Sequence, residues 1–203
     1  KLSSAFFIYL LQIPKWKNSY YEFSISPIYK INSHLNLSLN TSFGYGNNEY
    51  GYNFTKSDGS FGKRNTQTLN NSIYIAINFT PKNNLTFGAR HYWSKIWYDS
   101  FYKLNENGSL NVDSEYKQNA DLSQNYFNLD CIYTWEFAPG SFLNLIWKNN
   151  LNHYQESNDM IKSQNYFDNI KGTFSSPQHN AFTLKLIYFI DYNQARKALL
   201  KKH

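Results

Sequence analysis

The sequence predicts an all-β protein, specifically an antiparallel up-and-down transmembrane β-barrel. Three observations support this prediction. Apolar and polar side chains alternate with a period of two, charged side chains stay on the polar side of that alternation, and short turns alternate with long polar connections. Of the 203 residues, 41% are hydrophobic, 19% are aromatic and 28 are asparagine. This composition suits strands with one apolar and one polar face.

Composition and charge exclude several classes of protein. A single cysteine excludes a disulfide scaffold and a zinc site built from cysteines. The longest purely apolar run, residues 5–11, is too short for a transmembrane helix, which needs roughly 18 residues. The net charge of +6 owes much to Arg196, Lys197, Lys201 and Lys202, while the other basic residues are scattered among acidic ones. We therefore expect no nucleic-acid partner.

The N-terminal residues 1–16 leave two interpretations open. Residues 4–13 are apolar enough for a first strand but alternate poorly, so residues 1–16 are either that strand or a separate N-terminal segment. Because Lys1 is not an initiator methionine, we expect the chain to be mature or a fragment of something longer.

Seven further segments alternate clearly. In the first of them, Tyr21, Phe23 and Ile25 point to one side, and Glu22 and Ser24 point to the other. With residues 4–13 the chain would have seven or eight strands, within a barrel region at residues 17–193 and before a basic tail at residues 194–203. The seven segments are residues 21–31, 35–45, 72–79, 85–90, 127–137, 143–148 and 182–191.

The charged residues of these segments share one side of the alternation. A charge on the lipid side costs up to roughly 2–4 kcal/mol at the bilayer midplane, whereas a charge in the lumen can pair or stay hydrated. We therefore predict that the following side chains face the lumen: Glu22, Lys30, Arg90, Asp130, Glu136, Lys148, Lys185 and Asp191.

Connection length alternates along the chain as well. Residues 32–34, 81–84 and 138–141 are tight turns, whereas residues 47–70, 100–125 and 153–180 are long and polar. Bacterial outer-membrane barrels have short periplasmic turns and long extracellular loops. The sequence thus predicts the outer membrane of a Gram-negative bacterium, with the lipid bilayer as a partner and the long loops outside the cell.

The segment after residue 90 departs from the alternation. His91 and Lys95 fall on the side predicted to face lipid, so either a β-bulge near residues 90–92 resets the phase or the strand has left the hydrocarbon there. Aromatic residues close by favour the second explanation. The candidates for an aromatic girdle at the membrane interface are Trp93, Trp97, Trp135 and Trp147, with Trp16, Tyr20 and Tyr21 as further candidates.

Four strings of residues resemble a known family. They are Phe-Gly-Lys-Arg-Asn at 61–65, the run at 87–95 that contains Arg-His-Tyr-Trp-Ser, the run at 135–141 that contains Phe-Ala-Pro-Gly-Ser, and Trp-Lys-Asn at 147–149. Over residues 17–193 the chain resembles the C-terminal outer-membrane barrel of a Bacteroidota family classed as a domain of unknown function. The resemblance implies an N-terminal carbohydrate-binding module similar to family nine in full-length members, and a larger barrel of which this chain is the final segment. It implies no reaction.

No catalytic constellation is present in the sequence, and we expect neither an enzyme nor a cofactor or metal. The histidines lack the spacing of metal ligands, and Asp130 and Glu136 lie about 20 Å apart along one strand, too far for a glycosidase pair. Asp130 and Lys148 flank a short turn on the same side, which predicts an ion pair. Cys131 points to the apolar side and is interpreted as a small hydrophobe.

Three hypotheses follow. The first is a membrane-embedded barrel segment of undefined biochemical role, linked to surface glycan handling or transport. Its partners would be upstream strands of the same polypeptide, and glycans or other outer-membrane proteins. The second is a self-contained eight-stranded barrel with a structural or adhesive role, if residues 4–13 supply a strand. The third is a secreted β-sandwich enzyme or lectin.

Overall fold

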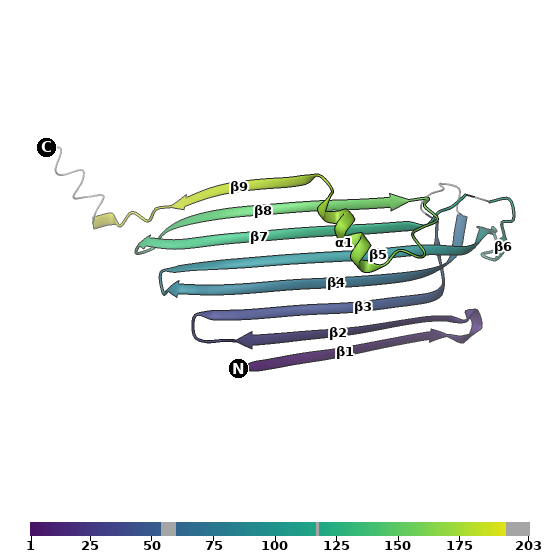
Figure 1. The fold of residues 1–203 in the computed structure, drawn as a ribbon, viewed down its shortest axis with the longest axis horizontal. Helices are drawn as coiled ribbons and strands as arrows, with labels where there is room; N and C mark the ends of the chain where they lie inside the picture. The colour runs from purple at the N-terminus through teal and green to yellow at the C-terminus, as the bar shows by residue number, and fades with distance from the viewer. Residues whose placement is uncertain (54–59, 117, 194–203) are drawn as a thin grey trace.

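A computed structural model describes residues 1–53, 60–116 and 118–193. The described chain forms one antiparallel sheet of nine strands in the order β1-β2-β3-β4-β5-β7-β8-β9, with β6 paired to β5 (Figure 1). The strands are β1 (Leu2–Ile13), β2 (Asn18–Lys30), β3 (Leu35–Tyr52), β4 (Ser60–Thr80), β5 (Asn83–Leu104), β6 (Leu110–Val112), β7 (Leu122–Ala138), β8 (Ser141–Glu156) and β9 (Gln178–Ile187), and the helices are the 3₁₀ helix η1 (Pro14–Trp16) and α1 (Tyr166–Phe174).

The eight long strands of the described chain run up and down, each beside its neighbour in sequence. The predicted turns at 32–34, 81–84 and 138–141 join β2 to β3, β4 to β5 and β7 to β8. These turns lie at the same end of the sheet as the start of β1 and the end of β9 (Figure 1). The sheet is not closed into a barrel: β1 and β9 are its two edges.

Residues 1–16 contain a strand, which settles the open question at the N-terminus. β1 pairs with β2 over its whole length, from Leu2 opposite Tyr29 to Ile13 opposite Asn18. Its alternation is poor because apolar side chains occupy both sides, as with the neighbours Phe6 and Phe7. With β1 and the short β6, the described chain has nine strands, more than the seven or eight that we predicted.

Parts of the predicted long loops are strand, which corrects our prediction of where the strands end. β3 and β4 extend into the predicted loop 47–70, and β5 extends to Leu104 within the predicted loop 100–125. These extensions carry polar residues on both faces, so they show no alternation. Residues 54–59, 117 and 194–203, including the predicted basic tail, lie outside the described residues.

The last strand is shorter than predicted. β9 ends at Ile187, so Asp191 lies beyond the strand that was predicted to place it in the lumen.

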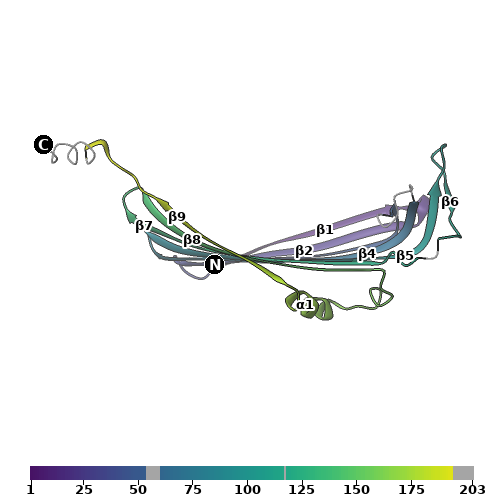
Figure 2. The same ribbon diagram turned by 90° about the horizontal axis from the view of Figure 1, so that it is seen from above.

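The two faces of the sheet differ in polarity. We call the apolar face the one that carries the register row Leu37, Ile75, Phe87, Cys131, Trp147 and Phe182. We call the polar face the opposite one, which carries the row Ser38, Tyr74, Gly88, Asp130 and Lys148. The described residues form a single layer, which is not the two-layer arrangement of a β-sandwich. Seen edge-on, the sheet is bowed, and α1 lies on its convex side (Figure 2).

Candidate functional site

Three charged side chains meet at the centre of the polar face. Arg90 on β5 donates from Nη2 to Oδ2 of Asp130 on β7 at 2.7 Å. Lys148 on β8 lies directly opposite Asp130 in the register, with its Nζ 3.7 Å from Oδ1. The Asp130–Lys148 ion pair predicted from the turn is therefore present, and Arg90 joins it. One carboxylate faces two cations, so this cluster has a net charge of +1.

Gly88 leaves room for this arrangement. It lies opposite Asp130 in the register, and a Cβ atom placed there would meet only Tyr74, at 3.9 Å. Because no side chain occupies this position, Arg90 can reach Asp130 diagonally from the next polar-face position of β5.

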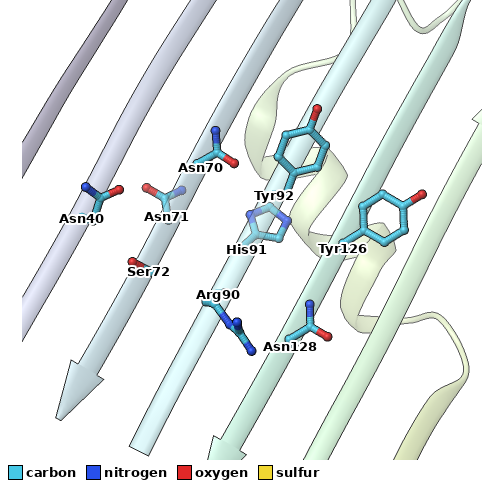
Figure 3. A pocket seen from close by; sticks show the side chains of 9 residues that line it. All are labelled: Asn40, Asn70, Asn71, Ser72, Arg90, His91, Tyr92, Tyr126 and Asn128. Atoms are coloured by element: carbon cyan, nitrogen blue, oxygen red, sulfur yellow. The ribbon is translucent and has the colours of Figure 1, made fainter. Parts of the chain in front are cut away.

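The surroundings of the charge cluster are rich in amides and tyrosines. A cavity of about 490 Å³ spans β3, β4, β5 and β7, and Figure 3 shows the side chains that line it. A second cavity, of about 440 Å³, shares Ser72 and Arg90 with the first and extends to Asp130 and Lys148. The residues that line the first cavity are Asn40, Asn70, Asn71, Ser72, Arg90, His91, Tyr92, Tyr126 and Asn128. Of these, Asn71 and His91 turn their side chains to the opposite, apolar face, where both contact Tyr166.

Hydrogen bonds between neighbouring strands hold several of these side chains. Asn40 donates to the hydroxyl of Ser26 at 2.6 Å, and Asn150 donates to Oδ1 of Asn128 at 2.6 Å. The rings of Tyr92 and Tyr126 stack with their centroids 6.2 Å apart. Such a surface offers uncharged donors and acceptors, aromatic faces and one fixed charge cluster. It can form hydrogen bonds with water and with polar solutes.

Four of the other predicted lumen charges lie on the same face, and the fifth, Asp191, lies beyond β9. Glu22 accepts a hydrogen bond from Tyr20 at 3.2 Å, and Glu136 accepts one from the backbone N–H of Gly140 at 3.1 Å. Lys30 lies near the tight turns, and Lys185 lies opposite Asn144. The structure thus brings together three of the eight predicted charges.

The departure from alternation on β5 has a structural cause that the sequence analysis missed. The register between β4 and β5 is continuous from Thr66 to Ile77, so no bulge resets the phase near residues 90–92. His91 and Lys95 do point to the apolar face, and both are buried there beneath α1 and the segment before it. Lys95 donates from Nζ to the carbonyl oxygens of Lys162 and Gln164 at 3.1 and 3.0 Å.

The four tryptophans predicted as a girdle fall into two groups. Trp93 and Trp97 are buried, with 2% and 8% of their surface exposed, and the Lys95 ammonium lies 5.7 and 5.2 Å from their ring centroids. This burial differs from the lipid contact expected of a girdle. Trp135 and Trp147 are exposed on the apolar face, and Trp147 donates to Oδ1 of Asn180 at 2.9 Å.

The helix α1 could have been found from its N-terminus. Asn165 caps it by accepting a hydrogen bond from the backbone N–H of Asp168 at 3.0 Å, and Asp168 places a carboxylate in the first turn. Both are helix-start signals. The contacts of α1 with the sheet have no such signal in the sequence.

The described residues contain neither a metal-binding cluster nor a membrane-spanning helix. Residues 1–53, 60–116 and 118–193 hold no group of three His, Cys, Asp or Glu side chains that could bind a metal ion. None of the helices described has the length and apolar character needed to cross a membrane.

Comparison with known proteins identifies the family. Searches of curated proteins and of solved structures gave no match. The family model of a domain of unknown function, DUF5916, matches residues 1–199, which includes β1 as well as the region of the resemblance. The chain therefore belongs to the DUF5916 family.

Proposed function

We propose that this chain is the C-terminal segment of a β-barrel in the outer membrane of a Gram-negative bacterium. The apolar face of the sheet contacts lipid, and the polar face lines the lumen. The observation that supports the proposal best is the apolar face itself, because the described residues leave much of it uncovered. Phe182, Leu184 and Leu186 on β9 are 78%, 68% and 61% exposed. A soluble protein rarely leaves a continuous apolar surface of this kind uncovered.

The path of the apolar side chains across the sheet also supports a barrel. On β1 they centre on Ile8 and Leu10. Along the register, Leu10 lies opposite Tyr21, and the same row continues through Tyr45 and Gln67 to Lys95.

The apolar residues of β5, Leu85 and Phe87, lie nearer to the tight turns than Lys95 does. The apolar band therefore crosses the register obliquely, as it must when strands tilt by about 35–45° through a membrane.

The polar face fits a hydrated lumen because its charged and amide side chains form ion pairs and hydrogen bonds. Asp130 pairs with Arg90 and Lys148, and amides such as Asn40 and Asn150 bond across strands. We propose that the longer polypeptide handles or transports polar solutes such as surface glycans. The carbohydrate-binding module and the Bacteroidota origin that the resemblance implies belong to this proposal. Its partners are then the outer-membrane lipid, the upstream strands that continue the sheet, and glycans or other outer-membrane proteins.

Surface labelling tests the topology. In cells that carry the full polypeptide with Cys131→Ser, a cysteine at Glu106 in the turn between β5 and β6 should react with a membrane-impermeant maleimide. A cysteine at Lys82 in the turn between β4 and β5 should react only after the outer membrane is permeabilised. Both positions are exposed, so access to the label depends on the side of the membrane. Labelling of Lys82→Cys but not Glu106→Cys on intact cells would contradict the topology, and recovery of the protein in the soluble fraction would contradict the barrel.

A second candidate is a self-contained eight-stranded barrel with a structural or adhesive role. Two observations favour it. The described chain has eight long strands, and the start of β1 and the end of β9 lie at the same end of the sheet, beside the tight turns. An eight-stranded barrel fills its interior with side chains, so it would not conduct solutes.

A further inference from the structure

We propose that α1 is a membrane-surface helix that lies in the headgroup region of the outer leaflet and inserts Phe167, Ile170 and Phe174 toward the acyl chains. This inference rests on the proposed barrel. It assigns a lipid-binding surface to a segment that was predicted to be part of an extracellular loop. Four properties of the helix support it: its direction, its height on the sheet, its inverted polarity, and the sector in which its apolar residues lie.

The helix crosses the strands instead of running along them. At its start, Tyr166 accepts a hydrogen bond from Nδ2 of Asn71 on β4 at 2.8 Å, and its ring lies 5.5 Å from that of His91 on β5. At its end, Phe174 packs against Phe127 on β7, with the ring centroids 5.0 Å apart. Strands of a barrel cross the membrane, so a helix that crosses the strands lies closer to the plane of the membrane (Figures 1 and 2).

The helix lies beside the apolar band. Phe127 lies opposite His91 in the register, and the next row of the apolar face contains Ala89 and Leu129. Towards the tight turns the apolar face continues with Phe87 and Cys131. The helix therefore lies at the boundary where the apolar side chains of β5 and β7 give way to polar ones.

The polarity of α1 is the reverse of that of a helix on a soluble protein. Its two fully buried residues are polar: Asn169 accepts hydrogen bonds from Ser123 at 3.0 Å and Asn125 at 3.1 Å, and Thr173 bonds to the backbone of the helix. Phe167 and Phe174, by contrast, are 79% and 51% exposed. A helix on a soluble domain turns its apolar stripe toward the core. The outward stripe of α1 matches an apolar surrounding.

The exposed surface of α1 is divided into two sectors. At 100° per residue, Phe167, Ile170 and Phe174 fall within about 60° of one another, on the side where Phe174 meets Phe127. Lys171 and Ser175 fall in the adjoining sector, away from the band. The apolar sector thus points along the sheet toward the lipid-facing band, and the polar sector points away from it.

A lipid surface is the occupant that fits these sectors. The apolar sector continues the exposed band of β7 and β8, where Leu145 and Trp147 are exposed. Lys171, beside the apolar sector, can extend to lipid phosphates while its stem stays on apolar surface. Interfacial helices lie about 5–10 Å into the boundary between headgroups and acyl chains. A protein partner could cover Phe167 and Phe174 but would interrupt the lipid contact of the adjoining strands.

Spin-label accessibility tests the inference in the full polypeptide, reconstituted in vesicles of phosphatidylethanolamine and phosphatidylglycerol. In a Cys131→Ser background, nitroxides are attached at Phe167→Cys, Phe174→Cys, Ser175→Cys and Leu145→Cys. Collisions with oxygen, which concentrates in lipid, are compared with collisions with a water-soluble nickel chelate. We expect oxygen to dominate at residues 145, 167 and 174, and the nickel chelate to dominate at 175. Positions 167 and 174 should be shallower than 145.

The control positions separate the two proposals. Ser175 is matched to Phe174 because it is the next residue and is also exposed. If residue 145 is in lipid while 167 is as accessible to the nickel chelate as 175, the inference about α1 is wrong and the barrel stands. If residue 145 itself is in water, the barrel proposal fails and the inference fails with it. Phe167 decides the result, because Phe174 also packs on Phe127 and its replacement could loosen the helix.

Discussion

At the scale of single residues, the polar face is organised around one carboxylate. Asp130 is 29% exposed in its side chain, and Arg90 and Lys148 are 64% and 63% exposed, so water screens all three charges. Exposed ion pairs contribute only about 0.2–1 kcal/mol. The cluster therefore sets the local charge of the face more than it stabilises the fold.

The geometry predicts unequal coupling within this cluster. Arg90 lies 2.7 Å from Asp130 and forms a hydrogen bond, whereas Lys148 lies 3.7 Å away. In double-mutant cycles of the folded protein in detergent, Asp130→Asn should couple more strongly to Arg90→Gln than to Lys148→Gln. We expect values within about 1 kcal/mol, measured by urea unfolding. Equal coupling, or stronger coupling to Lys148, would contradict the arrangement of the three side chains.

At the scale of elements, each long strand separates two environments. Beyond the register shifts beside two tight turns, at Asn78–Thr80 and Glu136–Ala138, the alternation of side chains continues up to the rows beneath α1. Beyond that height the strands mix polar with aromatic side chains, such as Trp97 and Tyr98 on β5. There α1 and the segment before it cover the apolar face of β5, β7 and β8. Strand and helix together therefore divide the surface into an apolar band, which the proposed barrel would turn to lipid, and a region above it.

Neighbouring positions on β4 provide a matched test of this division. Ile75 belongs to the apolar face and Ala76 to the polar face. Ile75→Arg should impair insertion by roughly 2–4 kcal/mol if the position is near the midplane, whereas Ala76→Arg should be milder because its charge reaches a hydrated lumen. The yield of heat-modifiable protein in the outer membrane measures the effect. Equal damage by both substitutions would indicate a protein core on both faces and a soluble fold.

At the scale of the whole molecule, the open sheet is the dominant fact. β1 and β9 are edge strands with all residues exposed, and their backbone groups on the outer side need partners. In lipid, unpaired backbone groups are too costly, so a spanning sheet must close. In the barrel that we propose, strands from an upstream part of the same polypeptide complete it.

The open edges predict the behaviour of the isolated chain. Residues 1–203, refolded in detergent, should give no heat-modifiable, protease-resistant monomer, because the two edges would stay unpaired. Gel mobility with and without heating, followed by limited proteolysis, measures this. The self-contained barrel predicts the opposite result: a compact monomer in which cysteines placed on β1 and β9 form a disulfide.

The sequence by itself determined the strands, their two faces and the tight turns, because these depend on contacts within a few residues or across a short turn. The Asp130–Lys148 pair was predictable for that reason. The sequence did not determine the extensions of β3, β4 and β5, since a strand with polar residues on both faces has no period to detect. Nor did it place α1 over the sheet. Only the tertiary structure decided that placement, because Tyr166 meets side chains 95 and 75 residues away at Asn71 and His91. Those contacts explain why His91, Trp93 and Lys95 depart from the rule that the rest of the apolar face follows.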